Sequence, residues 1–297
     1  MPKFGVSIYS ISSLIMSGQI TPAEGVRWLC ENGAETIEIV PFGIDLVGTP
    51  GLIDEFKKIS GEFKIPIENY SLNANFLGLS KEEYDAEVVR VKEHMDAAFK
   101  LGVSTMRIDS ASFRRPYASN TTENFQKELP LIIETYEMLC DYAAPHGVTV
   151  LLENHGFHIN GAERTRQVLL GVNRPNFAHQ LDVGNYACVD DRPEIAVMRN
   201  VDKAKVVHMK DFYIRDWNHY PGECEEYGDR KWIRTLNGNY LRGSITGHGD
   251  LNLRHIMKVI KDSGFDGSMF IEYEGMEEPK FGTFLSLQNM KRLWSEV

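Results

Sequence analysis

Two patterns of hydrophobic and polar positions alternate along this chain. Short apolar runs rich in β-branched residues, such as Val148–Leu152, are typical of strands that are buried on both faces of a sheet. Between these runs lie longer segments in which apolar residues recur at helical spacing. In Lys81–Leu101, for example, Val91, Met95 and Ala98 share one face, which predicts an amphipathic helix.

The alternation continues over the whole chain. Strands are predicted over Phe4–Tyr9, Thr36–Val40, Ile67–Leu72, Ser104–Ile108, Val148–Leu152, Phe177–Asp182, Ala204–His208 and Ser268–Glu272. Helices are predicted over about 22–32, 52–63, 81–101, 122–146, 161–170, 193–199, 251–263 and 283–294.

Eight strands that alternate with eight helices imply a parallel sheet, and eight such units in 297 residues favour a closed (β/α)8 TIM barrel over an open doubly wound sheet. The segment YSISSL after the first strand lacks the GxGxxG of a dinucleotide-binding fold. The interpretation is therefore one α/β domain, residues 1–297, with a long irregular insertion at about 211–246 after the seventh strand.

Composition narrows the class of protein. With 42 acidic and 32 basic residues, the net charge of −10 disfavours nucleic acid as a partner. No apolar run is long enough to span a bilayer, and the first residues do not resemble a signal peptide. Cys30, Cys140, Cys188 and Cys224 show no CxxC spacing, which suits a reducing compartment. We therefore expect a cytoplasmic protein without a membrane partner.

Polar residues end four successive strands of the second half. They are Glu153, Asp182, His208 and Glu272. A carboxylate or imidazole at the tip of a buried strand needs a partner, and the tips of neighbouring barrel strands meet at one rim. We therefore expect these four residues to hold one divalent metal. Three carboxylates and one imidazole favour Mn²⁺ or Mg²⁺, with Co²⁺ or Zn²⁺ as alternatives.

Each of these residues also has a plainer explanation. Asp182 can accept hydrogen bonds from turn amides, and His208 can be a hydrogen-bonded core histidine. Glu272 competes with Glu274 for the role of ligand, and it is preferred because it directly follows the apolar run. The four polar tips together favour the metal interpretation over the separate explanations.

The motifs LLENHG, QLDVGN, VVHMKD and FIEYEG, in this order, resemble the xylose isomerase-like TIM-barrel superfamily of sugar isomerases and epimerases. The resemblance covers essentially the whole chain. It implies that Glu153, Asp182, His208 and Glu272 bind the metal and that the two glutamates act as the acid/base pair. Two positions depart from the epimerase pattern. Asn185 stands where a substrate-binding histidine is usual, and Lys210 lies near the position of a common arginine.

The expected reaction is a proton transfer on a ketose or related sugar. Glu153 and Glu272 would face the bound sugar from opposite sides; one takes a proton, and an enediolate forms. Return of the proton to the opposite face of the same carbon gives an epimerase, and return to the neighbouring carbon gives an isomerase. The expected partner is a small sugar, and a homodimer or homotetramer is left open.

Three other functions remain open. A metal-dependent dehydratase of a polyol or keto-acid would use the same metal and expel water. An endonuclease IV-like phosphodiesterase needs more metal ligands and a basic face, which the acidic balance disfavours. A sugar-binding module would not need two opposed carboxylates.

Two further residues near the tips are candidates for substrate binding. His155 would donate to a substrate hydroxyl or support a metal ligand. Lys210 would neutralise developing negative charge, or form a structural ion pair with Asp109 or Asp211.

Three candidates lie farther from the motifs. His248 lies in a glycine-rich turn that would bind a phosphate, although Asp250 as the N-cap of the next helix is the alternative. Glu38, at the tip of the second strand, would line the pocket. Trp217, in the insertion, would cover a sugar or contribute to a subunit contact.

Overall fold

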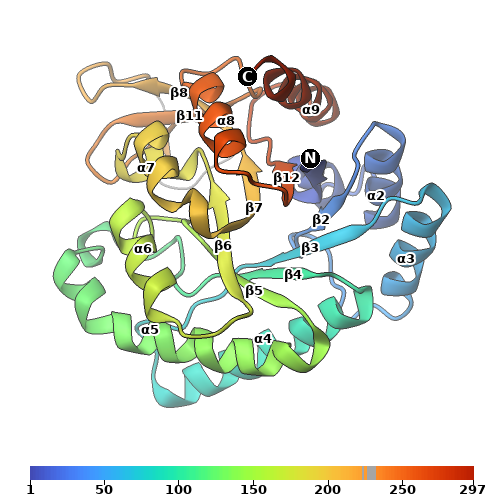
Figure 1. The fold of residues 1–297 in the computed structure, drawn as a ribbon, viewed down its shortest axis with the longest axis horizontal. Helices are drawn as coiled ribbons and strands as arrows, with labels where there is room; N and C mark the ends of the chain where they lie inside the picture. The colour runs from blue at the N-terminus through green and yellow to red at the C-terminus, as the bar shows by residue number, and fades with distance from the viewer. Residues whose placement is uncertain (223, 226–231) are drawn as a thin grey trace.

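Eight parallel strands close into a barrel in this computed structural model, which describes residues 1–222, 224–225 and 232–297 (Figure 1). Around the barrel the strands follow the order β1-β12-β7-β6-β5-β4-β3-β2. Their bounds are Lys3–Ser7 (β1), Ile37–Ile39 (β2), Ile67–Leu72 (β3), Thr105–Ile108 (β4), Thr149–Glu153 (β5), Phe177–Asp182 (β6), Ala204–Met209 (β7) and Ser268–Ile271 (β12). The predicted (β/α)8 barrel is confirmed.

Helices cover the outside of the barrel (Figure 1). They are α1 (Ser12–Met16), α2 (Pro22–Glu31), α3 (Leu52–Phe63), α4 (Lys81–Leu101), α5 (Thr122–Ala143), α6 (Ala162–Gly171), α7 (Pro193–Asn200), α8 (Leu253–Asp262) and α9 (Pro279–Glu296). Short 3-10 turns extend some elements, as at Ile8–Ile11 after β1 and Ala144–His146 after α5. The first strand is therefore shorter than predicted and ends at Ser7.

Local sequence explains where the helices begin. Thr21 and Glu24 form a capping box at the start of α2, where Pro22 occupies the first turn. Ser80 and Glu83 form the same arrangement at α4. Side chains thus satisfy amide groups that have no partner within the helix.

The barrel interior is layered because successive strand residues face opposite sides. Leu151, Val206 and Phe270, each the third residue of its strand, form an apolar cluster. Two residues farther along their strands, Glu153, His208 and Glu272 are polar and buried. The apolar layer closes the lower part of the barrel and leaves the polar layer at the carboxyl-terminal rim, where TIM-barrel sites lie.

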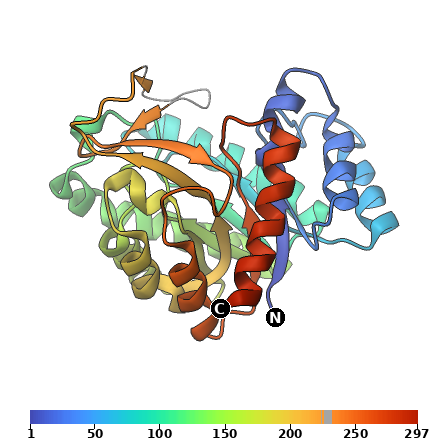
Figure 2. The ribbon, with the colours of Figure 1, turned by 90° about the horizontal axis from the view of Figure 1, so that it is seen from above.

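In the residues that the structure describes, the insertion after β7 forms a ribbon of paired strands rather than an irregular loop, so that part of the prediction is wrong. β8 (Asp211–Arg215) pairs with β11 (Tyr240–Ser244), and the short strands β10 (Trp232–Arg234) and β9 (Cys224–Glu225) extend the sheet. The ribbon lies on the side of the molecule away from the two termini (Figure 2).

The base of the ribbon is fixed to the barrel. Phe212 and Leu241 are buried in an apolar cluster with Phe157 and Ala187. The carboxylate of Asp211 accepts the amide hydrogens of Gly247, Gly249 and Leu251, where the chain returns. One carboxylate thus ties the start of the insertion to its end.

Two expectations drawn from composition can be compared with the structure. In the described part of the chain, no helix is both long and apolar enough to cross a membrane. Cys30, Cys140 and Cys188 are buried and free. The side chain of Cys224 lies outside the described part.

Candidate metal centre

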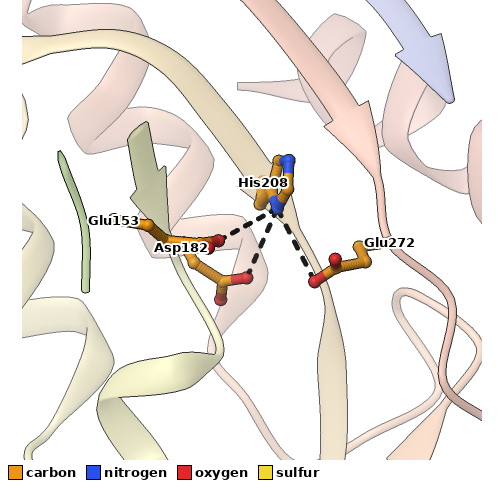
Figure 3. A group of neighbouring side chains, drawn as sticks. All are labelled: Glu153, Asp182, His208 and Glu272. Carbon is orange, nitrogen blue, oxygen red and sulfur yellow. Dashed lines mark ion pairs between the residues drawn. The ribbon is translucent and has the colours of Figure 1, made fainter. Parts of the chain in front are cut away.

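Four side chains from adjacent strand ends point toward one another (Figure 3). They are Glu153 of β5, Asp182 of β6, His208 of β7 and Glu272 directly after β12. Asp182 lies opposite His208 in the strand register, which brings their side chains to the same level of the barrel. Parallel strands end on the same side, so residues far apart in sequence meet here.

The imidazole of His208 lies at the centre of the group. Its Nδ1 is 3.1 Å from Glu153 Oε1, 3.6 Å from Glu272 Oε2 and 3.8 Å from Asp182 Oδ2. One donor atom from each of the four residues lies within 4.8 Å of all the others. This spacing suits four ligands around one cation, whose bonds to oxygen would be about 2.0–2.6 Å.

Three of these atoms make no hydrogen bond although they are buried: Glu153 Oε1, Asp182 Oδ2 and His208 Nδ1. A buried polar atom without a hydrogen bond costs on the order of 1–3 kcal/mol, so three at one point call for a common partner. Carboxylate oxygens and an imidazole nitrogen are ligands that divalent ions accept. The donor set therefore fits a divalent metal.

The other atoms of two of these residues are held in place. His208 Nε2 lies 2.8 Å from Glu38 Oε2, so Nε2 carries the proton and Nδ1 faces the cluster. Asp182 Oδ1 accepts the amide hydrogens of Gly184 and Asn185 at 2.8 and 2.7 Å. The turn-amide explanation of Asp182 thus holds for one oxygen, while the other oxygen faces the cluster.

Glu38 does not line the pocket from a strand tip as predicted. It lies in the middle of β2, is fully buried, and also accepts hydrogen bonds from Asn69 Nδ2 and Ser71 Oγ. The alternation along β2 turns its side chain into the barrel, directly against His208. Its contact is therefore with a candidate ligand.

A buried arginine holds Glu153 from the other side. Arg107 Nε lies 3.0 Å from Glu153 Oε2, and Arg107 Nη1 lies 3.0 Å from Asp109 Oδ2. Asp109 Oδ2 in turn lies 2.9 Å from His155 Nδ1. His155 is the outermost residue of this series of contacts, and a quarter of its side chain is accessible. It is thus oriented by Asp109 at the edge of the cluster.

Lys210 belongs to the cluster, and the prediction of a structural ion pair with Asp109 or Asp211 is wrong. Its Nζ lies 2.6 Å from Glu272 Oε2, 3.5 Å from Asp182 Oδ2 and 3.4 Å from Glu274 Oε2. It also donates to Asn185 Oδ1 at 3.3 Å. Asp109 and Asp211 are instead held by Arg107 and by backbone amides.

Burial and neighbouring charges separate the pKa values of the carboxyl groups. Burial alone would raise the pKa of Glu153, but Arg107 and His208 lower it to about 2. Burial, with the charges of Glu153 and Glu272, raises the pKa of Asp182 to about 7. For Glu272, burial is opposed by Lys210 and His208, which hold its pKa well below the usual range.

The pKa of His208 is shifted upward, opposite to those of Glu153 and Glu272. Burial lowers the pKa of His208, but Glu38, Glu272 and Glu153 raise it well above its usual value. The protein without a metal thus keeps protons and ammonium or guanidinium groups among the carboxylates. A metal would replace part of that positive charge.

Two predicted substrate-binding residues do not lie in this cluster. His248 is exposed, and Gly247 and Gly249 beside it donate their amides to Asp211, so these amides do not point at a phosphate site. The N-cap of α8 is Asn252, so the alternative role of Asp250 as N-cap is wrong.

Trp217 lies beyond the outer end of β8 and is 72% exposed. Substrate contact by Trp217, like that by His248, stays a prediction.

The sequence prediction does not include Arg107, and it names Asp109 only as a partner of Lys210 rather than of Arg107. The signal was available, because an arginine in the middle of a short apolar strand, STMRI, must find a buried anion. Gln180 was also missed; it hydrogen-bonds Asn69 and Ser71 beneath His208.

The comparisons with known proteins agree with this architecture. The sequence model of the xylose isomerase-like TIM barrel family matches residues 26–293, so the chain belongs to that family. No curated protein matches the chain.

Three similar solved structures each share 16% sequence identity with this chain. 3-Keto-D-glucoside 4-epimerase YcjR from E. coli has a TM-score of 0.69, with 98% of this chain and 100% of that chain covered. The IOLI protein with a bound zinc atom has a TM-score of 0.71, with 99% and 98% covered. The probable 3-DHS dehydratase AsbF from Bacillus anthracis has a TM-score of 0.72, with 98% and 99% covered. At this identity the likeness shows a shared fold.

Proposed function

We propose that this protein is a divalent-metal-dependent sugar isomerase or epimerase that moves a proton on a ketose or related sugar. Glu153, Asp182, His208 and Glu272 would hold the metal, with Mn²⁺ or Mg²⁺ favoured by the three carboxylates. The observation that carries the proposal is the convergence of these four donors, three of which make no hydrogen bond although they are buried. Membership of a family that includes sugar epimerases supports the same class of reaction.

A divalent ion bound here would polarise a substrate carbonyl and acidify the neighbouring C–H group. Glu272 is the better placed of the two glutamates to carry the proton. Its Oε2 faces the cluster and Lys210, whereas its other oxygen forms no ion pair within the described part of the chain. Glu153 has Oε1 toward the cluster and Oε2 beside Arg107.

The residues at the edge of the cluster would bind the sugar. The buried Nδ2 of Asn185 makes no hydrogen bond and is available to a substrate oxygen. His155, oriented by Asp109, would contact a hydroxyl group, and Lys210 would stabilise negative charge on an oxygen. A small sugar, rather than nucleic acid, is the proposed partner because the donors lie inside an acidic barrel.

A specific feature keeps the dehydratase as a second candidate. Arg107 Nε lies 3.0 Å from the second oxygen of Glu153, so neither oxygen of Glu153 is free to carry a proton when Oε1 binds the metal. An epimerase needs proton transfer on two faces, whereas a dehydratase needs one base and one acid. Glu272 and the His155–Asp109 pair could supply these two roles. The dehydratase AsbF shares the fold.

The experiment is hydrogen exchange in D₂O, followed by NMR, with Mn²⁺ and a panel of ketoses, keto-sugars, polyols and keto-acids. Deuterium at carbon with a changed configuration or carbonyl position supports the isomerase or epimerase. An enone that absorbs in the ultraviolet supports the dehydratase.

Glu272→Gln should abolish the reaction on whichever substrate is found, and Glu274→Gln, the same change two residues away, should lower it far less. Full turnover by Glu272→Gln would show that the proton carrier is another group.

A further inference from the structure

Lys210 and the proposed metal compete for the same oxygen atoms. The two oxygens that face His208 Nδ1 from Asp182 and Glu272 are the two that Lys210 Nζ approaches, at 3.5 and 2.6 Å. A cation in the centre of the cluster would bind both oxygens. The ammonium and a divalent ion therefore cannot both keep short contacts with them without strong repulsion.

We propose that Lys210 is an exchangeable internal cation: its ammonium balances the cluster in the metal-free protein and withdraws toward the substrate side when a divalent metal binds. This inference rests on the proposed metal centre and adds a residue that sets its affinity. Lys210 is here a positioning residue, because it acts through Glu272 and Asp182.

The structure provides a place for the displaced ammonium. Glu274 Oε2 and Asn185 Oδ1 already lie 3.4 and 3.3 Å from Lys210 Nζ. The side chain of Glu274 is 31% accessible, whereas those of Asp182 and Glu272 are 0% and 9% accessible. A small rotation of the lysine would therefore move its charge from the buried oxygens toward the more accessible carboxylate of Glu274 without leaving it unpaired.

Gly184 makes room for the stem of Lys210. A Cβ atom at this position would lie 2.4 Å from Cγ and 3.1 Å from Cδ of Lys210. Gly184 has φ −87° and ψ −33°, which any residue can adopt, so its backbone does not require glycine. A side chain is excluded here by the lysine stem and also by the ring of Phe212, whose Cε2 would lie 3.1 Å from the added Cβ.

Arg107, the other buried cation of the site, is fixed and does not compete. It touches Glu153 through Oε2, the oxygen that faces away from the cluster, and it hydrogen-bonds Leu72 O and Asn73 Oδ1. The ammonium of Lys210, by contrast, contacts only side chains among the described residues: Asp182, Glu272, Glu274 and Asn185. The two cations therefore have different roles around one group of carboxylates.

The test is Mn²⁺ titration of the metal-stripped full-length protein by calorimetry, with thermal melts of the same samples. Lys210→Met should bind Mn²⁺ roughly tenfold more tightly or better, a coupling of ordinary size. Without metal it should melt below the wild type, and excess Mn²⁺ should raise its melting temperature by more than it raises that of the wild type. Lys210→Arg should restore the lower affinity.

Two further variants separate this role from simple structural support. Gly184→Ala, which displaces the lysine stem but retains its charge, should also tighten Mn²⁺ binding. Lys258→Met, which removes an exposed lysine that pairs with Asp262, should change neither quantity.

Unchanged or weaker Mn²⁺ binding by Lys210→Met would overturn the exchange. If the wild type itself fails to bind one Mn²⁺ per chain, the proposed metal centre fails, and the exchange fails with it. If the wild type binds and only the lysine effect is missing, the metal centre stands alone.

Discussion

The hydrogen bond between Glu38 and His208 should set the metal affinity of the centre, and Glu38→Gln tests this. The carboxylate is fully buried, and its Oε2 accepts from His208 Nε2 at 2.8 Å, Asn69 Nδ2 at 2.5 Å and Ser71 Oγ at 2.9 Å. A glutamine keeps an acceptor oxygen in this position. Its amide nitrogen would take the place of Oε1, which makes no hydrogen bond. The variant should therefore fold.

The magnitude follows from the loss of charge. A hydrogen bond to a charged group contributes about 1.5–3 kcal/mol, and a neutral one about 0.5–1.5 kcal/mol. The substitution should therefore cost about 1–2 kcal/mol of metal binding, or about 5- to 30-fold in affinity. This agrees with the roughly 10- to 100-fold losses typical of residues that orient metal-binding histidines.

The assay is calorimetric titration of the metal-stripped variant with Mn²⁺, after circular dichroism has established that it is folded. Glu68→Gln is the matched control. Glu68 pairs with Lys3 and Ser268 at the amino-terminal ends of the strands, so its loss should leave metal affinity unchanged. A folded Glu38→Gln protein with the affinity of the wild type would refute the reasoning.

Three other predictions follow. Arg107→Met leaves the carboxylate of Glu153 without its guanidinium partner and should lower the free energy of unfolding by about 3–5 kcal/mol in urea denaturation; a loss below about 1 kcal/mol would contradict it. Burial lowers the pKa of His179 to about 4 from 6.5, so wild-type stability should fall as the pH drops through this window, by up to roughly 3 kcal/mol more than in His179→Gln. Parallel pH profiles of the two proteins would exclude this. Since the pKa values of His208 and Asp182 are raised, in Asp182 to about 7, Mn²⁺ binding should release protons and weaken below about pH 7. Binding enthalpies that are independent of the buffer's ionisation enthalpy would argue against it.

Sequence was sufficient for the barrel and for the convergence of the four strand ends. Apolar runs end at Glu153, Asp182, His208 and Glu272, and parallel strands deliver their ends to one rim. Both predictions require only local sequence patterns and the rule that parallel strands end at the same rim. The position of Lys210 in the cluster could not be obtained in this way, because its partners Glu272 and Asp182 come from other strands.

The remaining differences also come from long-range packing. The sequence predicts Glu38 at the tip of the second strand. In the structure β2 ends one residue later, at Ile39, and the side chain of Glu38 points inward against His208. The sequence predicts an irregular insertion because β8 and β11 pair across many intervening residues rather than through a short turn. The sequence of a short segment does not show which distant segment its strand will pair with.

The carboxylate of Asp211 has a consequence for how this protein can diversify. It joins the points where residues 212–246 leave and re-enter the barrel. Changes in length or sequence farther out along the ribbon should therefore not move the rim. Changes in that outer segment should then leave the spacing between His208 and Glu272 unaltered. Removing the carboxylate of Asp211 should end this independence, because the ribbon and the rim would then shift together.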